Sequence, residues 1–242
     1  MKHTILISIS ILGLCLDASL LAAETPADLS KGLIGYWRFD EATGDQIKDS
    51  SGDANHGALQ GAVRAVGKFG GAIECKKDAL VVVPNSGSLS QMKEGITVAA
   101  WVNWATNSSW NMIVSREVKG GTSEYFGLAI VKNKALFSVD PDGAHYKDVK
   151  SAKDMPPGEW VHLAGTYNNA EIKLYVDGRL VKSDALAVPF QFQDQNPLVI
   201  GGNSNNECKS WVDCFYGLLD EVRLYNRPLS DAEILAIRNL KL

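Results

Sequence analysis

Apolar and polar residues alternate along many short stretches of the chain, and a period of two is the pattern of a β-strand with one face on a core. Turns rich in Gly, Asp, Asn and Ser separate these stretches. The predicted strands cover residues 33–40, 72–84 with an interruption at 77–78, 96–104, 112–116, 125–131, 135–139, 160–167, 171–176, 179–182, 197–201 and 218–225. Many short strands with turn-rich connections predict an all-β fold, a sandwich of two antiparallel sheets.

The last predicted strand carries a carboxylate in an unusual place. Asp220 falls on the same side of this strand as Leu218 and Val222, which are expected to face the core. A lone carboxylate is costly to bury, so a charge there needs a cation or several hydrogen-bond donors around it. We therefore expect Asp220 to point inward and to have a partner.

One short helix is predicted behind that strand. The segment Asn226-Arg227-Pro228 breaks the strand, and Ser230 followed by Glu233 forms a capping box that opens a helix. This helix is expected to extend to about Asn239. The predicted fold is therefore an antiparallel β-sandwich with a single C-terminal helix.

Composition and the first residues predict where the protein works. The 242 residues are 45% hydrophobic with a formal net charge of −4, a balance that does not favour nucleic acid as a partner. The apolar run at 5–16 is too short to span a bilayer and predicts a secretory signal peptide over residues 1–23. Residues 24–32 are then a short lead, and 33–242 form one domain. We expect it to be secreted, extracellular or periplasmic, without membrane insertion after cleavage.

The cysteines suit an oxidising compartment. Cys208 and Cys214 lie six residues apart in a polar loop and are predicted to form a local disulfide. Cys75 is interpreted as a small buried apolar residue in a strand. Lipidation of Cys15 is an alternative to secretion, but Leu14 is bulky for the position before a lipidated cysteine.

Five stretches in order give the chain a family resemblance: GLIGYWRFDE, DSSGDANHG, ITVAAWV, GEWVHLAGTY with LYVDGRLV, and LLDEVRLYNRPLSDAEI. Together they resemble the laminin-G-like and pentraxin-like domains of the concanavalin A-like jelly-roll superfamily, from Leu33 to Ile237. This resemblance implies a jelly roll that binds glycans or proteins outside the cell, or that accompanies a secreted enzyme. Many such domains hold one structural calcium ion.

The resemblance also implies where calcium would bind. Calcium takes six to eight hard oxygen ligands, and turns rich in glycine expose carbonyls for it. The implied ligand set is Asp40, Asn55 and Asp220, with carbonyls near His56 and Gly57. Asp49 is either a further ligand or the cap of the turn that follows it. In the alternative interpretation all these acids are turn residues, and backbone donors satisfy Asp220.

The sequence does not predict an enzyme. Some members of this superfamily cleave β-glucans with carboxylates that alternate along one strand, as glycoside hydrolysis requires a suitably spaced pair. No such Glu-x-Asp-x-x-Glu run occurs, and the neighbours Asp220 and Glu221 are expected on opposite faces of a strand. His162 is interpreted as a packed or hydrogen-bonded strand histidine.

Aromatic residues supply the candidate binding surface. Flat rings cover the C–H faces of sugars, while amides and carboxylates bind the hydroxyls. Trp37, Trp101 and Trp160 are predicted core residues. The candidates lie at strand ends or in polar loops: Trp104, Trp110, Tyr125, Tyr146, Trp211 and the amide of Asn205. For each ring the alternative is packing at the edge of the core.

These observations predict a secreted, non-catalytic module that binds a glycan. The first alternative is an adhesion or matrix module that binds an extracellular protein. The second is an accessory domain of a secreted enzyme system.

Overall fold

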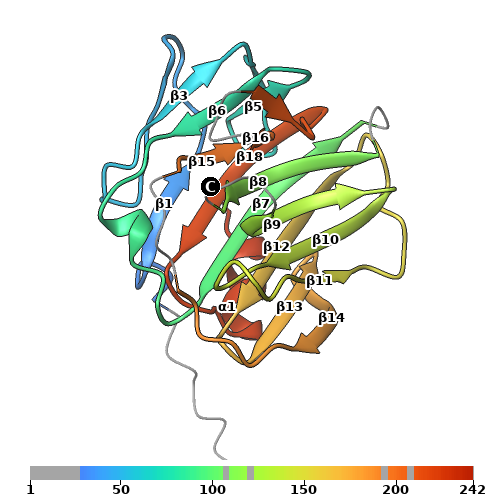
Figure 1. The fold of residues 1–242 in the computed structure, drawn as a ribbon. Helices are drawn as coiled ribbons and strands as arrows, with labels where there is room; N and C mark the ends of the chain where they lie inside the picture. The colour runs from blue at the N-terminus through green and yellow to red at the C-terminus, as the bar shows by residue number, and fades with distance from the viewer. Residues whose placement is uncertain (1–27, 106–108, 119–122, 192–195, 206–209, 242) are drawn as a thin grey trace, which may run out of the picture.

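The protein is a sandwich of two antiparallel β-sheets, as the computed structural model shows (Figure 1). It describes residues 28–105, 109–118, 123–191, 196–205 and 210–241, with the backbone alone for residues 205, 210 and 211. The predicted signal peptide lies outside these residues. The antiparallel sandwich with one C-terminal helix is as predicted.

The first sheet places the last strand near its centre. Its order is β14-β13-β12-β7-β18-β5-β4, and β1 also pairs with β18. The strands are β1 (Leu33–Trp37), β4 (Val63–Val66), β5 (Gly71–Cys75), β7 (Ile96–Trp104), β12 (Trp160–Tyr167), β13 (Glu171–Val176), β14 (Arg179–Ala185) and β18 (Gly217–Tyr225).

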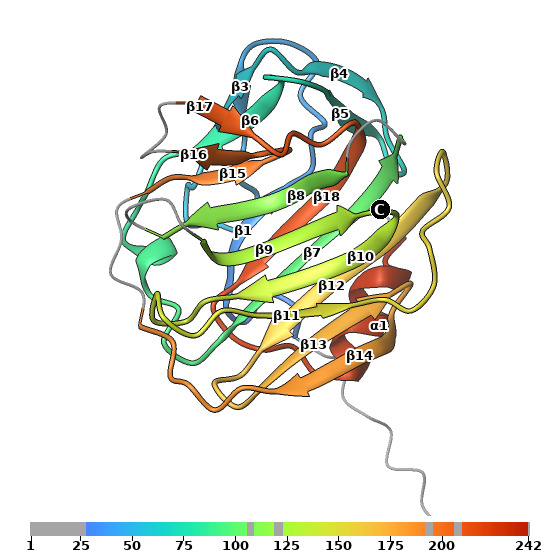
Figure 2. The same cartoon turned by 45° about the vertical axis from the view of Figure 1, so that its right-hand side comes forward.

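The second sheet has the order β11-β10-β9-β8-β15-β6-β3-β2 and lies against the first (Figure 2). Its strands are β2 (Gln46–Ile47), β3 (Gly57–Gln60), β6 (Leu80–Val83), β8 (Trp110–Glu117), β9 (Glu124–Val131), β10 (Lys134–Val139), β11 (Lys147–Lys150) and β15 (Leu198–Ile200). A separate hairpin of β16 (Asn203–Asn205) and β17 (Ser210–Val212) follows β15. A 3-10 turn, η1, covers Ser88–Ser90.

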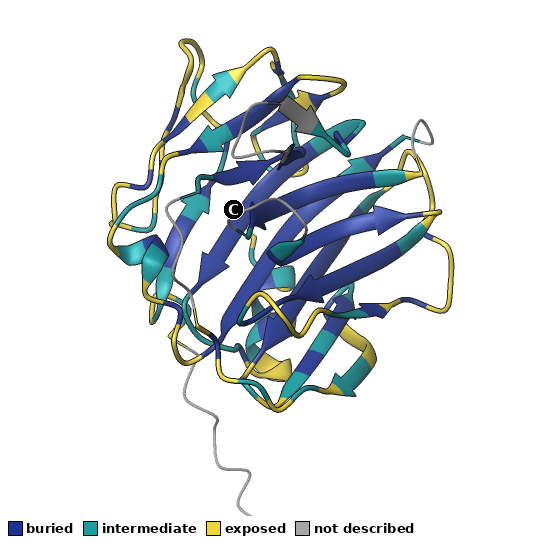
Figure 3. Ribbon diagram, viewed as in Figure 1, coloured by how far each residue is buried: buried dark blue, intermediate teal, exposed yellow. Residues whose placement is uncertain are grey.

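The main core fills the space between the two sheets, where the strands are almost wholly buried (Figure 3). Its large side chains come from both sheets and include Trp37, Trp104, Phe126, Phe137 and Phe215. Cys75 is buried among them, in agreement with its interpretation as a small apolar residue.

The C-terminal helix covers the other face of the first sheet. Helix α1 (Asp231–Asn239) begins with the predicted capping box, in which Ser230 and Glu233 bond reciprocally. Its buried Ile234 and Ile237 pack on a second apolar cluster with Tyr175 and Tyr225. No helix in the described part of the chain is long and apolar enough to cross a membrane.

The predicted orientation of Asp220 is wrong. A bulge interrupts the pairing of β18 with β7 between Asp220 and Arg223, and Glu221 adopts a left-handed φ of 53°. The extra residue breaks the alternation, so Leu219, Val222 and Leu224 enter the core while Asp220 points to the opposite face. Asp220 is nevertheless fully buried, because the turn between β4 and β5 covers it.

Candidate functional site

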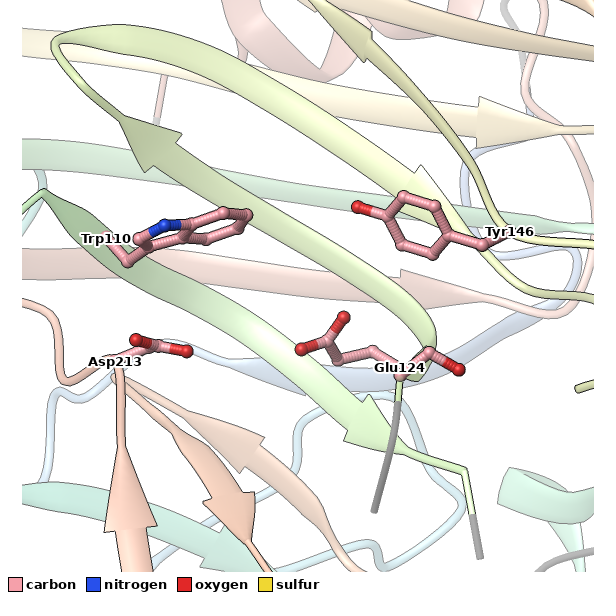
Figure 4. A pocket seen from close by; sticks show the side chains of 5 residues that line it. Trp110, Glu124, Tyr146 and Asp213 are labelled. Atoms are coloured by element: carbon pink, nitrogen blue, oxygen red, sulfur yellow. The ribbon is translucent and has the colours of Figure 1, made fainter. Parts of the chain in front are cut away.

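A cavity of about 330 Å³ lies on the second sheet and is the candidate site. Its lining residues are Trp110, Ser123, Glu124, Tyr146 and Asp213. In Figure 4 the two rings lie on opposite sides, and the carboxylates of Glu124 and Asp213 point into the space between them. The site therefore combines two aromatic rings with two acids.

The strand alternation places Trp110 on the face of the second sheet that points away from the first. Ile113, Ile130 and Phe137 enter the core between the sheets, whereas a separate apolar patch lies on the opposite face. That patch consists of Met112, Ala129, Val131 and Leu136, and Trp110 packs against it. The indole is thus held in place by apolar contact while remaining half-buried at the cavity.

Tyr146 forms the other side of the cavity from the segment directly before β11. Its side chain is 45% exposed, so a ligand can reach the ring. Partial burial raises the pKa of Tyr146 to about 12, and nearby Asp148 contributes in the same direction. The phenol therefore stays protonated at neutral pH and can both donate and accept a hydrogen bond.

Glu124 is held by the hairpin of β16 and β17. Its Oε1 accepts a hydrogen bond of 2.6 Å from Asn203 Nδ2, and Asn203 Oδ1 accepts one of 3.1 Å from the hydroxyl of buried Ser115. Behind Asn203, the Ser204 hydroxyl donates to Glu117 Oε2 at 2.5 Å. This network fixes one carboxylate oxygen of Glu124, and Figure 4 shows the carboxylate directed toward the cavity.

Asp213 reaches the cavity through a backbone contact with β8. It has a left-handed φ of 48°, and its carbonyl accepts a hydrogen bond of 2.9 Å from the Met112 amide. Burial raises the pKa of Asp213, and burial together with the charge of Asp213 raises the pKa of Glu124. The negative charge of Asp213 therefore acts on Glu124 at the cavity.

The structure brings together only part of the predicted binding set. Trp110 and Tyr146 both line the cavity. Trp104 is a correction: it is buried in the core, where its indole donates to the Pro156 carbonyl at 3.0 Å. Tyr125 is also a correction, because it packs in the core beside Phe190. The side chains of Trp211 and Asn205 lie outside the described residues.

Sequence reasoning missed Ser123, Glu124 and Asp213. An acid at the start of a strand is common, and nothing in the local pattern marks it as part of a site. Only the pairing of distant segments brings these residues to the cavity. Strand β9 pairs with β8 so that Glu124 lies opposite Glu117. An isolated β-bridge joins Cys214, the residue after Asp213, to Met112. Those two pairings bring the acids to the same face as Trp110.

Three of the predicted calcium ligands are occupied by the chain itself. Asp49 caps its turn, because its oxygens accept from the amides of Tyr36, Ser51 and Asn55. The Asn55 side chain bonds to the Ile34 carbonyl and to two serines. At His56 the predicted ligand is a nearby backbone carbonyl, and the ring itself accepts from the Asp49 amide. These side chains hold the loop together.

The other two predicted ligands lie at the turn between β4 and β5. Asp40 pairs with Arg38 at 3.0 Å and accepts from the Gly71 amide. Asp220 Oδ2 accepts from the Phe69 amide at 2.9 Å, while Oδ1 has no hydrogen-bond partner. Among the described residues no group of three or more His, Cys, Asp or Glu could hold a metal. The calcium ion therefore stays a prediction.

The structure also places two of the cysteines and His162, for which the sequence predicted structural roles. Cys208 lies outside the described residues, and the structure shows Cys75 and Cys214 as buried free thiols whose pKa values burial raises. His162 is fully buried, neither ring nitrogen has a hydrogen-bond partner, and burial lowers its pKa to about 3. It packs against Trp101 at 5.4 Å between ring centroids, as expected of a packed strand histidine.

Comparison with known proteins agrees with this fold. The family model of the concanavalin A-like lectin/glucanases superfamily matches residues 76–235. A curated relative, "Adhesion G-protein coupled receptor V1" of Danio rerio, is 25% identical over 165 residues, which are 62% of this chain and 2% of the receptor. The chain thus spans a very small part of that relative.

Solved structures of other proteins share this fold. The binding domain of Paraclostridial Mosquitocidal Protein 1 has a TM-score of 0.69 at 15% identity, over 87% of this chain and 52% of that one. Domain 4 of the arabinanase AbnA from Geobacillus stearothermophilus, in complex with arabinotriose, has a TM-score of 0.68 at 19% identity, over 86% and 98%. The binding domain of botulinum neurotoxin DC, in complex with rat synaptotagmin II, has a TM-score of 0.67 at 13% identity, over 87% and 52%.

Proposed function

The chain belongs to the concanavalin A-like lectin/glucanases superfamily, and from this premise we propose that it binds a glycan in the cavity between Trp110 and Tyr146. The observation that carries the proposal is the pairing of two accessible rings with two acids in one cavity. Rings can cover the C–H faces of a sugar, and carboxylates accept hydrogen bonds from its hydroxyls.

The size and support of the cavity suit such a ligand. A volume of about 330 Å³ lies at the lower end of the range for small-molecule sites, about 300–1,000 Å³. It would take the end of a glycan or a short stretch of it. Rigid sheet strands carry Trp110 and Glu124, so little ordering is needed on binding. The structurally similar domain 4 of the arabinanase AbnA, solved with arabinotriose, supports a glycan as the ligand class.

We propose that the site binds without catalysis and that the protein acts outside the cytoplasm. The similar solved structures are binding domains, which supports a binding role for Glu124 and Asp213. The predicted signal peptide supports secretion. A calcium ion stays a separate prediction, and Asp220 is the predicted ligand that keeps an oxygen without a partner.

A glycan array followed by calorimetry on the selected oligosaccharide tests the proposal. Trp110→Ala and Tyr146→Ala should each weaken binding at least tenfold, which is about 1.4 kcal/mol. Leu180→Ala is the matched control, because it removes an exposed apolar side chain from β14 in the other sheet. Glycan binding that all three variants retain would place the site elsewhere.

A protein partner is the second candidate function. It is favoured by the match to an adhesion receptor and by the toxin domain solved with synaptotagmin II. Under this alternative the array would show no selective glycan. Extracellular proteins tested for capture would then bind in a manner that Trp110→Ala disrupts.

A further inference from the structure

Resting on the proposed function, we propose that the cavity selects glycans with a positively charged amino group, that is, amino sugars that are not N-acetylated. The ammonium would lie between the carboxylates of Glu124 and Asp213, beside the rings of Trp110 and Tyr146. This assigns a ligand class to the site from its charge and not only from its shape.

The first argument is the uncompensated negative charge. The described lining residues include two acids and no lysine, arginine or histidine. Glu124 has the neutral amide of Asn203 as its partner, and the Asp213 carboxylate has no hydrogen bond or ion pair within the described part of the chain. Glu117, directly opposite Glu124 in the β8–β9 pair, adds a further negative charge that acts on Glu124.

The second argument is the contrast with other acids of this protein. Glu221 lies 2.6 Å from the Arg223 guanidinium, and Glu233 lies 2.7 Å from that of Arg227. The fold thus provides a guanidinium for each of these two acids. The described lining residues of the cavity provide no cation to Glu124 or Asp213.

The third argument is the position of the rings. A cation is attracted to the face of an aromatic ring within about 6 Å of its centroid, most strongly for tryptophan. Figure 4 places the two carboxylates beneath the gap between Trp110 and Tyr146. An ammonium in that gap would meet both acids and at least one ring. A hydroxyl or the N–H of an acetamide could donate a hydrogen bond to a carboxylate there, but neither group carries a positive charge to offset the two acids.

Three tetrasaccharides with the same β-1,4-linked backbone test this inference. They differ at carbon 2, which carries a hydroxyl in cellotetraose, an acetamide in N-acetylglucosamine tetramer and an amine in glucosamine tetramer. Binding to the full chain is measured by calorimetry at pH 6 and low salt, with chelator present. We expect the amine to bind at least tenfold more tightly than the other two, with an advantage that decreases as salt is added.

Neutral variants identify the groups responsible. Glu124→Gln and Asp213→Asn should each reduce the advantage of the amine over the two neutral tetramers at least fivefold. Glu74→Gln is the matched control, since it removes the same charge from an exposed position on β5 in the other sheet. Melting curves of the variants confirm that each is folded, and the two acids provide independent substitutions should one fail.

The outcomes separate this inference from the function on which it rests. Equal binding of all three tetramers that Trp110→Ala abolishes would overturn the amine selectivity and leave the glycan site standing. An amine preference that Glu74→Gln reduces as much as Glu124→Gln would reveal general attraction to an acidic protein, and would also overturn it. Failure to bind any tetramer or any arrayed glycan would overturn both proposals.

Discussion

Replacing Asp220 with Asn tests how the fold accommodates a buried carboxyl. The side chain is fully buried, and one of its oxygens has no hydrogen-bond partner. Burial is the main reason that its pKa is raised from 3.8 to about 7. A Cβ on Gly67 would lie 2.6 Å from Asp220 Oδ2, which shows how closely the covering turn approaches. We therefore expect ionisation of Asp220 to destabilise the protein.

The sign and size follow from proton linkage. The folded state holds the Asp220 proton more tightly than the unfolded state, so this contribution is full below pH 3.8 and is lost as the pH rises toward 7. Each tenfold change in the equilibrium corresponds to about 1.4 kcal/mol. Ionisation therefore lowers the free energy of unfolding by roughly 2–3 kcal/mol more at pH 8 than at pH 5.

His162 makes a contribution of opposite sign. Burial lowers its pKa to about 3 from 6.5, so its stabilising contribution is present above pH 6.5 and is lost as the pH falls toward 3. The change of this His162 contribution with pH is expected to be the same in wild type and in Asp220→Asn. The difference between the two proteins at each pH therefore isolates Asp220, and the amide keeps an acceptor for the Phe69 N–H.

Urea unfolding in chelator at pH 5 and pH 8 measures that difference. The variant should gain roughly 2–3 kcal/mol relative to wild type between the two pH values. Asp53→Asn, at an exposed turn position, should show no such change. An equal effect of Asp220→Asn at both pH values would refute the reasoning, because it would mean that the carboxylate is compensated in the fold.

Three further predictions concern the calcium ion, the cap of helix α1 and the disulfide. If calcium binds at Asp220, adding it after chelation should raise the melting temperature of wild type by several degrees and leave Asp220→Asn unmoved; a response in neither protein, with no metal by elemental analysis, would contradict the ion. Ser230→Ala removes the capping box of α1 and should cost about 1 kcal/mol in urea unfolding, whereas Ser90→Ala, outside that helix, serves as the comparison. Intact mass without reductant should show the Cys208–Cys214 disulfide, with Cys75 alkylated only after unfolding; two reactive thiols at 208 and 214 in the native protein would exclude it.

The fold could be predicted from sequence because its central strands are long and strongly patterned. The predicted bounds of β7, β12 and β13 match those of the structure. The strands that were missed, such as β2, β4 and β11, are only two to four residues long. In β4 no residue is buried, so its sequence has no apolar alternation. Such strands are defined by their hydrogen-bonded partners, which the sequence does not reveal.

The candidate site was predictable only in part, for a related reason. Trp110 and Tyr146 could be predicted as binding residues because large aromatic rings are unusual beside polar loops. Trp104 fitted the same description, but a carbonyl of a distant loop satisfies its indole inside the core. Glu124 and Asp213 become neighbours through pairings between segments about 90 residues apart. The orientation of Asp220 depended on one bulged residue, which reverses the faces of a strand.

The acids on the two sheets are buried in different ways, and this difference distinguishes a structural role from a binding role. Asp220 is closed off from solvent, so only the chain or a permanently bound ion can compensate it. Glu124 and Asp213 are half-buried at an open cavity, where a diffusing ligand can reach them. Burial raises the pKa of both carboxyls, and the charge of Asp213 adds to this effect at Glu124, so a cation between them would favour their ionised forms. The electrostatic part of the binding energy would come from offsetting two negative charges that the described residues leave without a cation. We therefore expect the cavity to discriminate between ligands by charge as well as by shape.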